Sequence, residues 1–291
     1  MSQVIISADS PCDIGPELIE KYNIQIMNWR ILLEGKEYID GVEIFPEDLY
    51  KAWWERKVLP KTSSCIPVEY ETFFAPLLEQ GYDIVHIGLG SGLSGSYQHA
   101  CTAKKKLGRV FPVDSQNLST GFGALVVQAA ELAQQDMPAA EIQTRIQDMT
   151  QRVHASFLID TLEFMRAGGR CNTLTMLGAN LFNIKPCIEV ENDNGGLMHV
   201  GEKYRGKMER CLRLYVHDKF AGRTDIDLSR VFITHSGSPE SDIEIVKEEI
   251  SGLQSFRECH VTKTGCVIST HCGPRTLGIA FMTTSSSPKS S

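Results

Sequence analysis

Residues 83–114 read DIVHIGLGSGLSGSYQHACTAKKKLGRVFPVD. The apolar run over residues 83–89 predicts a buried strand, and the glycine-rich turn after it leads into a predicted helix that ends near Lys106. A second apolar run, residues 109–113, predicts the next strand. A strand, a helix and a strand in this order are typical of a βαβ unit, so this stretch indicates parallel strands covered by helices.

The same alternation of strands and helices continues on both sides of this stretch. Before it, the sequence predicts a strand at residues 4–6, a helix that begins near Pro16, a hairpin across residues 29–40 and a helix over residues 46–57. After it, the sequence predicts helices over 121–135, 161–167, 207–220 and 240–253, and strands over 154–159, 186–191, 197–201, 231–234, 267–270 and 278–283.

A change in composition near residue 150 divides the predicted α/β chain into two lobes. Residues 1–153 are expected to form an N-terminal α/β domain with a mainly parallel sheet. Residues 154–284 are expected to form a C-terminal α/β domain with a mixed sheet. The serine-rich residues 285–291 are expected to be a disordered tail.

Composition excludes several classes of protein. The chain has 291 residues, of which 42% are hydrophobic and 22% charged, as in globular proteins. Its net charge of -7 leaves no basic surplus for nucleic-acid binding. No basic leader and no apolar stretch of about 20 residues is present, so a cytoplasmic location is expected. The nine scattered cysteines, with no C-x-x-C pair, are expected to be reduced and mostly structural.

The glycine-rich turn supports three interpretations. Gly90, Gly92 and Gly95, with Asp114 about 20 residues further on, satisfy the G-x-G-x-x-G pattern of NAD-binding proteins. Against this, Ser91 and other hydroxyls occupy a turn in which a pyrophosphate needs bare backbone. The turn can also be purely structural. The third interpretation is a carboxylate site, because a helix N-terminus attracts anions and serine hydroxyls can complete their binding.

Two further segments carry candidate binding groups. The hydroxyl cluster Thr62-Ser63-Ser64 lies in a predicted polar loop and can bind a ligand or cap the next helix. His271 follows the predicted strand 267–270 beside a Gly-Pro turn, where functional loops often lie. A packed, hydrogen-bonded histidine is the alternative there.

The remaining charged motifs have simpler explanations. Gly168-Gly169-Arg170 reads as a helix C-cap with an incidental arginine, and Lys185 and the segment 203–205 read as solvated cations.

Several catalytic motifs are missing from the sequence. Ser94 does not lie in a G-x-S-x-G nucleophile elbow, because Ser96 occupies the second glycine position. No P-loop, no H-E-x-x-H and no closely spaced histidine pair occurs, so neither a metal nor phosphoryl-transfer machinery is expected.

Taken in order, these motifs resemble the DegV family over nearly the whole chain. The most discriminating parts are the S-G-L-S-G turn and the long stretch that ends in Gly-Gly-Arg. The resemblance rests on Asp9-Ser10 with Asp13, Thr62-Ser63-Ser64, residues 91–98, Val113-Asp114-Ser115, residues 160–170, Ile184-Lys185-Pro186 and residues 265–274.

The resemblance implies a DegV/EDD-like protein that binds one long-chain fatty acid in an apolar tunnel. It further implies the FakB-type component of the bacterial fatty acid kinase system, which supplies acyl-phosphate for phospholipid synthesis. In that system a separate FakA-type kinase subunit phosphorylates the carboxylate, so this chain is expected not to be an enzyme itself. No cofactor is expected, and the resemblance extends the partners to transient contact with a membrane or an acyltransferase.

The resemblance also assigns residues. Thr62, Ser94 and His271 would bind the fatty-acid carboxylate. Arg170 and Arg205 would contact the kinase or the phosphorylated product. The supporting residues would be Ser63, Ser91, Gly95 and Asp114.

This sequence departs from the family pattern at two places. Arg275 stands where the family usually has a second glycine after Gly273-Pro274, which can change the shape of the loop that carries His271. The segment 63–67 reads Ser-Ser-Cys-Ile-Pro in place of the commoner Ser-Gln-Pro-Ser, which can alter the mouth of the pocket. Two other functions stay open from sequence: an NAD-dependent enzyme and a lipid-responsive regulatory module. The preferred acyl chain and the oligomeric state are not predicted.

Overall fold

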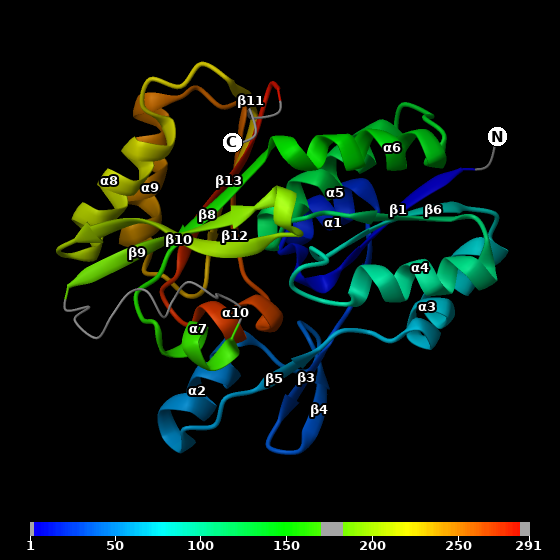
Figure 1. The fold of residues 1–291 in the computed structure, drawn as a ribbon, viewed down its shortest axis with the longest axis horizontal. Coiled ribbons are helices and arrows are strands. Elements are labelled where there is room, and N and C mark those ends of the chain that lie inside the picture. The colour runs from blue at the N-terminus through cyan, green and yellow to red at the C-terminus, as the bar shows by residue number, and fades with distance from the viewer. Residues whose placement is uncertain (1–2, 170–182, 286–291) are drawn as a thin grey trace.

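The computed structural model describes residues 3–169 and 183–285. Two larger sheets lie side by side, and a small third sheet lies below them (Figure 1). One large sheet is parallel and the other is mixed, which confirms the predicted α/β class. The predicted contact residue Arg170 and nearly all of the predicted tail lie outside the described residues.

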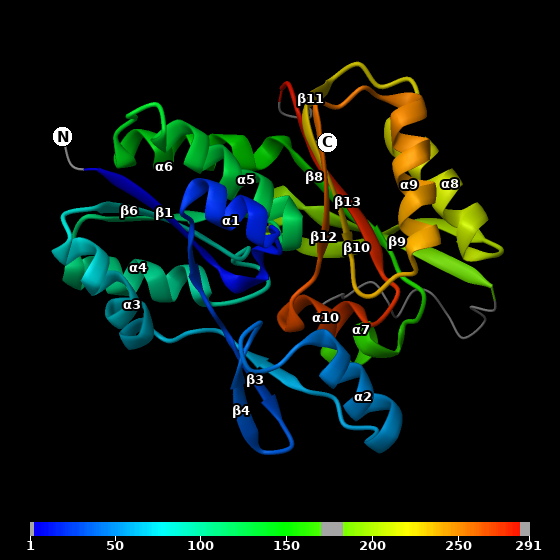
Figure 2. The same ribbon diagram turned by 180° about the vertical axis from the view of Figure 1, so that it is seen from behind.

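The first sheet is parallel throughout and has the strand order β2-β1-β6-β7. Helices α3 and α4 cover one face, α5 and α6 cover the other, and α1 packs on α5, as the view from behind shows (Figure 2). The strands are β1 (Val4–Asp9), β2 (Gln25–Met27), β6 (Asp83–Gly88) and β7 (Val110–Asp114), and the helices are α1 (Pro16–Tyr22), α3 (Pro67–Glu79), α4 (Ser96–Leu107), α5 (Ser119–Ala133) and α6 (Ala139–Met149).

The second sheet has the order β10-β9-β8-β13-β11-β12, and its strands pair antiparallel except for β11 with β12. Helices α8 and α9 lie together on its outer face (Figure 1). Its elements are β8 (Val153–Leu158), β9 (Ile184–Glu191), β10 (Leu197–Arg205), α8 (Met208–Phe220), β11 (Ile226–His235), α9 (Glu240–Leu253), β12 (Glu258–Lys263) and β13 (Leu277–Thr283).

Helix α5 joins the two large sheets. It contacts β1 and β6 of the first sheet and β8, β11 and β13 of the second. Because both sides of the helix face protein, nearly all of its residues are buried, from Ser119 through Leu132. This explains why its sequence is apolar all round rather than amphipathic. One hydrophobic core therefore runs from the first sheet through α5 to the inner face of the second.

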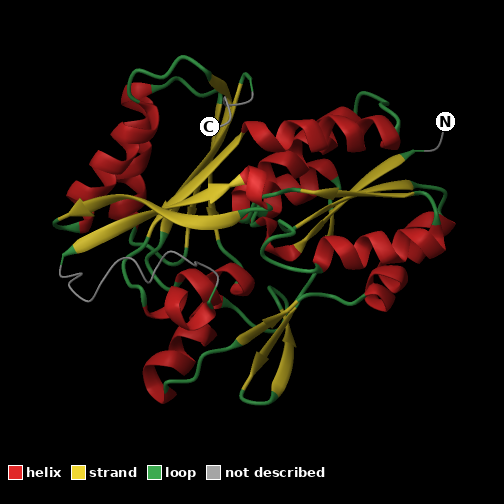
Figure 3. Ribbon diagram, viewed as in Figure 1, coloured by secondary structure: helices red, strands yellow, loops and turns green. Residues whose placement is uncertain are grey.

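The small sheet has the order β4-β3-β5, and helices α2, α7 and α10 lie beside it (Figure 3). The predicted hairpin is confirmed as β3 and β4. The expected polar loop after α2 instead contains the strand β5, whose three residues are too few for a sequence pattern. The elements are β3 (Arg30–Leu33), β4 (Lys36–Ile39), α2 (Pro46–Arg56), β5 (Lys61–Ser63), α7 (Glu163–Gly168) and α10 (Cys266–Cys272).

The strand predicted over residues 267–270 is wrong, because this segment lies in helix α10. Its apolar and β-branched residues favour a strand by local propensity. Tertiary contacts override that propensity: the N–H groups of Gly265 and Cys266 donate to the buried carboxylates of Asp13 and Asp40. The structure also contains two strands that the sequence does not predict, β2 and β12.

Within residues 3–169 and 183–285, no helix has the length and apolar character needed to cross a bilayer. In the same ranges, no three His, Cys, Asp or Glu side chains come together as a metal site would require. The described cysteines are all free thiols, and most of them are buried.

Candidate functional site

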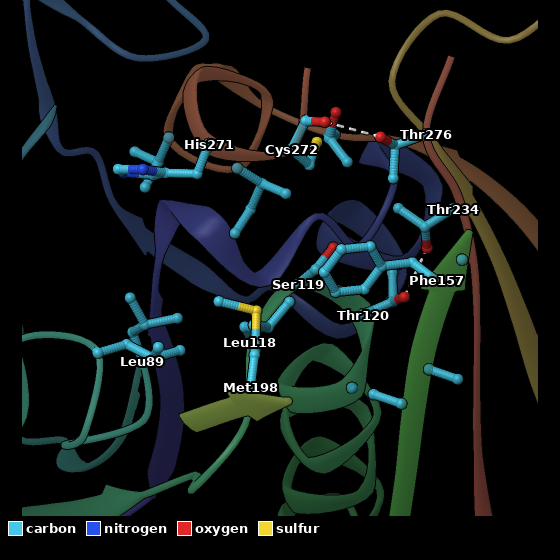
Figure 4. A pocket seen from close by; sticks show the side chains of 18 of the residues that line it. Leu89, Leu118, Ser119, Thr120, Phe157, Met198, Thr234, His271, Cys272 and Thr276 are labelled. Carbon is cyan, nitrogen blue, oxygen red and sulfur yellow. Dashed lines mark hydrogen bonds between the residues drawn. The ribbon is translucent and has the colours of Figure 1, made fainter. Parts of the chain in front are cut away.

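A cavity of about 370 Å³ lies between the inner face of the second sheet, the start of α5 and helix α10 (Figure 4). This volume is at the lower end of the range for ligand pockets. Apolar side chains from all three surfaces and from the turn after β6 make up most of its wall. They include Leu89, Leu93, Leu118, Ala155, Phe157, Met165, Met198, Val267, Ile268, Ile279 and Ala280.

The deep wall of the cavity also carries hydroxyl groups, and these are bound by the protein itself. Thr120 Oγ1 and Thr234 Oγ1 lie 2.5 Å apart, and Thr276 Oγ1 donates to the carbonyl of Cys272 at 2.9 Å (Figure 4). Ser156 Oγ pairs with the Tyr215 hydroxyl at 2.9 Å. Since these groups already have partners, this part of the wall can face an apolar ligand without leaving buried polar atoms unsatisfied.

Two residues far apart in sequence meet at the cavity. Thr62 Oγ1 lies 3.1 Å from His271 Nε2, and both side chains line the cavity. Thr62 lies in β5, which pairs with β3 so that Thr62 is opposite Ile31. Because side chains alternate along a strand, the neighbouring Ser63 points away: it is exposed and does not line the cavity. The supporting role assigned to Ser63 has no geometric basis here.

The imidazole of His271 packs against the end of α7. A Cβ atom on Gly168 would lie 2.3 Å from His271 Nδ1, so any side chain at this position would displace the imidazole. Gly169 has φ +62° and caps α7 by donating its N–H to the carbonyl of Met165. Gly169 is therefore a helix C-cap, as the sequence predicts. Gly168 has a second role, because it leaves room for the imidazole of His271. No sequence pattern indicates this second role.

Ser94 reaches the same cavity from the turn after β6. Its Oγ accepts a hydrogen bond from the Ser96 N–H at 3.2 Å, and Gly95 beside it also lines the cavity. Helix α4 begins at Ser96, so the Ser94 hydroxyl lies at a helix N-terminus. The structure thus brings the three predicted carboxylate-binding residues, Thr62, Ser94 and His271, to one cavity.

The glycines of this turn serve close packing rather than dinucleotide binding. The N–H of Gly92 donates to the carbonyl of Gly195 at 2.9 Å, and the N–H of Gly90 donates to the carbonyl of Asn117 at 2.9 Å. A Cβ atom on Gly90 would lie 2.4 Å from the Gly195 oxygen. The backbone of the turn is thus occupied by the β9–β10 connection, and no space is left there for a pyrophosphate.

Asp114 is likewise used inside the protein. Its Oδ1 accepts hydrogen bonds from the N–H groups of Ser91 at 3.0 Å and Gln116 at 3.1 Å. Asp114 is buried and Ser91 is exposed, and neither residue lines the cavity. Asp114 therefore fixes the turn that carries Ser94 and does not present a carboxylate to a ribose. These contacts argue against the NAD-dependent alternative.

A buried polar network at the end of β1 supports the same turn. Asp9 Oδ2 accepts a hydrogen bond from the Leu89 N–H at 3.1 Å, and Asp9 Oδ1 accepts one from the Tyr70 hydroxyl at 2.5 Å. His86 Nε2 lies 3.4 Å from Asp9 Oδ1. Burial alone would raise the pKa of Asp9, but the contacts with His86, Tyr70 and Leu89 outweigh it and lower the pKa. A charged Asp9 thus holds the start of the turn.

The two departures from the family pattern are accommodated locally. Arg275 has φ +58°, so it keeps the left-handed backbone that a glycine adopts without strain. Its guanidinium lies 3.3 Å from a carboxylate oxygen of Asp242 and 3.8 Å from one of Asp160. In the second segment, the buried Cys65 accepts a hydrogen bond from His99 Nδ1 at 2.8 Å through its carbonyl. Neither change displaces His271 or Thr62 from the cavity.

Arg205, the described member of the predicted arginine pair, is the last residue of β10 and is exposed. It does not line the cavity. Lys185, on the paired strand β9, forms an ion pair with Asp160.

Comparison with known proteins identifies the family of this chain. A sequence profile described as "Uncharacterised protein, DegV family" matches residues 3–284. A DegV domain-containing protein of Clostridium acetobutylicum is 30% identical over 287 residues, which cover 97% of this chain and 99% of that one.

Solved structures show the same fold. A DegV family protein of Thermus thermophilus, whose structure is described as showing fatty acid binding, has a TM-score of 0.86 and 26% identity, with 97% of this chain and 100% of that chain covered. A stearic acid-binding protein of Eubacterium ventriosum has a TM-score of 0.80 and 21% identity, with 97% and 98% covered. The profile spans nearly the whole sequence, and the chain belongs to the DegV family.

Proposed function

We propose that this protein binds one long-chain fatty acid in the cavity, in the cytoplasm, and presents its carboxylate to a separate fatty acid kinase subunit. The observation that carries the proposal is the division of the cavity wall. Its deep hydroxyls are paired within the protein and most of its wall is apolar, and the polar side chains of Thr62, His271 and Ser94 line the same cavity, with Thr62 in contact with His271.

The apolar wall supports binding of an acyl chain. Each methylene group that leaves water contributes about 0.8 kcal/mol, so a chain of fatty-acid length has a large driving force for burial. The Thermus thermophilus relative, described as binding fatty acid, has the same fold at 26% identity. These observations support the first part of the proposal, that this protein binds the acyl chain in the cavity.

The second part of the proposal, presentation of the carboxylate, rests on Thr62, Ser94 and His271, which we call the head-group site. A carboxylate buried without partners costs several kcal/mol, so the site must supply hydrogen bonds. The Ser94 Oγ accepts the Ser96 N–H, which leaves its own proton for a carboxylate oxygen. When His271 carries its proton on Nε2, that N–H donates to Thr62 Oγ1 and leaves the Thr62 hydroxyl proton for a carboxylate oxygen. Hydroxyls and an imidazole, unlike a buried arginine, leave the carboxylate nucleophilic enough to accept a phosphoryl group.

The phosphoryl donor must come from a partner in this proposal. The sequence has no P-loop, so the chain serves as the lipid-binding subunit and a kinase subunit supplies ATP chemistry. Arg205 is exposed and lies outside the cavity, as suits a contact with the kinase or with the phosphorylated product. Release of acyl-phosphate to a membrane or an acyltransferase would complete the cycle.

Ser94→Ala and Thr62→Ala are each expected to weaken fatty-acid binding by roughly 1 to 3 kcal/mol, because each removes a partner of a buried charge. Binding of a radiolabelled fatty acid to the purified variants measures this. Ser251→Ala is the matched control, since Ser251 is exposed at the end of α9, where its hydroxyl donates to the Glu248 carbonyl. Wild-type affinity in both cavity variants would remove the proposed head-group site.

Arg205→Ala is expected to slow acyl-phosphate formation with the kinase about tenfold while leaving fatty-acid affinity unchanged, because it removes a charged contact to the partner only. Acyl-phosphate trapped as the hydroxamate measures turnover in a mixture of both subunits, ATP and fatty acid. Arg145→Ala, in the exposed i, i+4 ion pair with Glu141 on α6, is the control. Loss of lipid binding in Arg205→Ala, or unchanged turnover, would contradict the assignment.

A further inference from the structure

Two buried carboxylates from the N-terminal part of the chain hold the first turn of α10. Asp13 Oδ1 accepts the Gly265 N–H at 2.7 Å, and Asp40 Oδ1 accepts the Cys266 N–H at 2.8 Å. The exposed fractions are 8% for Asp13 and 2% for Asp40. These N–H groups lie at the start of the helix, where they have no partner within it. Both acids thus bind the helix that carries His271 in its last turn.

Each of these carboxylates is anchored by its second oxygen. Asp13 Oδ2 accepts a hydrogen bond from Ser119 Oγ at 2.5 Å, and Asp40 Oδ2 accepts one from Ser10 Oγ at 2.9 Å. Ser119 begins α5, lines the cavity and has φ +48°. Such a left-handed backbone in a residue other than glycine persists only where the surrounding structure enforces it. The acids therefore connect α10 to α5 and to the end of β1 through hydrogen bonds from Ser119 and Ser10.

Helix α10 needs such anchors. It spans only Cys266–Cys272, and helices this short are not stable by their own hydrogen bonds. Its β-branched residues add no helical propensity. Its position is set at the start by Asp13 and Asp40, and at the end by the contact of His271 with Gly168. A shift of the first turn would therefore be transmitted along the helix to the imidazole.

We propose that Asp13 and Asp40 are positioning residues for the head-group site: they hold α10 in the register at which His271 Nε2 meets Thr62 Oγ1. Neither acid lines the cavity, so both act through the helix and not on the ligand. The inference rests on the proposed function, because it assigns these residues to the site that binds the carboxylate.

The chemistry of the two acids offers a conservative variant. Burial raises the pKa of Asp40, and it raises the pKa of Asp13 to about 8, so a neutral side chain is tolerated at these places. Asparagine keeps a carbonyl oxygen that can accept the N–H of Gly265 or Cys266. Alanine keeps no acceptor and leaves that N–H buried without a partner.

The test compares a long-chain fatty acid with the fatty alcohol of the same length, which lacks the carboxylate. Asp40→Ala is expected to lower the affinity for the acid about tenfold and to leave the affinity for the alcohol unchanged, whereas Asp40→Asn restores binding of the acid. Asp13→Ala and Asp13→Asn should behave in the same way. Equal losses for acid and alcohol would mean a merely structural role, and no loss for the acid would overturn the proposal.

Two further comparisons keep the outcome unambiguous. If Asp40→Ala does not fold, Ser10→Ala removes the hydrogen bond to Asp40 Oδ2, together with the one that Ser10 Oγ accepts from the Trp29 N–H. Ser10→Ala is expected to weaken binding of the acid about threefold more than binding of the alcohol, since any effect through Trp29, which lines the cavity, acts on both ligands. Equal changes for acid and alcohol, or no change for the acid, would then overturn the inference. Wild-type protein that binds neither ligand would refute the proposed function itself. Wild-type protein that binds both equally would refute its head-group site.

Discussion

Ala280→Phe is expected to lower the affinity for a long-chain fatty acid by about 100-fold, the largest effect on binding that we predict. Ala280 lies on β13 opposite Ala155 of β8, and both side chains line the cavity. A phenyl ring in a space of about 370 Å³ excludes several methylene groups of the ligand. At about 0.8 kcal/mol for each methylene, losing four of them costs roughly 3 kcal/mol.

Titration with a fluorescent or radiolabelled fatty acid measures this loss. Ala140→Phe, which adds the same ring to an exposed position of α6, is the matched control and should bind as the wild type does. A thermal melt of both variants tests whether the ring enters the cavity or strains the core, since overpacking costs about 1 to 3 kcal/mol of stability. A folded Ala280→Phe variant with wild-type affinity would place the acyl chain elsewhere.

Asp13→Asn is expected to increase stability progressively more as the pH rises from about 4 to about 8. Burial raises the pKa of Asp13 from the ordinary value of 3.8 to about 8 in the folded protein. The unfolded chain therefore loses this proton at lower pH than the folded one, and the wild type loses stability as the pH rises between the two values. The full difference is on the order of 6 kcal/mol at 1.36 kcal/mol for each pKa unit.

Asparagine does not titrate between about pH 4 and pH 8, so the variant keeps the stability that the wild type loses as the pH rises. The free energy of unfolding, measured with urea at several pH values, gives the difference between variant and wild type. Asp148→Asn removes an exposed carboxylate from α6 and serves as the control, with no comparable rise in relative stability expected. A constant difference between Asp13→Asn and the wild type across this range would contradict a buried, protonated Asp13.

Much of the fold could be predicted because most helices and strands are long enough to show a pattern. The βαβ unit of residues 83–114 and the buried helix α5 were predicted from runs of apolar residues, and the structure confirms both. Short elements such as β5, with three residues, carry too little pattern. Helix α10 was predicted as a strand because its conformation depends on Asp13 and Asp40, which are distant in sequence.

The site could be predicted only in part, for a similar reason. Thr62 and His271 are separated by 209 positions, and no local spacing indicates that they meet. They were named through the resemblance to the DegV family. Gly168 was interpreted as a cap, and its contact with His271 depends on how α7 and α10 pack. Asp40 was not singled out, because an acid in a predicted hairpin gives no sign that it will be buried.

The most direct measurement of the central claim is the lipid content of freshly purified protein. Organic extraction followed by mass spectrometry should recover close to one long-chain fatty acid for each protein molecule, and Ala280→Phe prepared in parallel should yield almost none. A ratio near zero from wild-type protein, with no uptake of added fatty acid, would contradict the account.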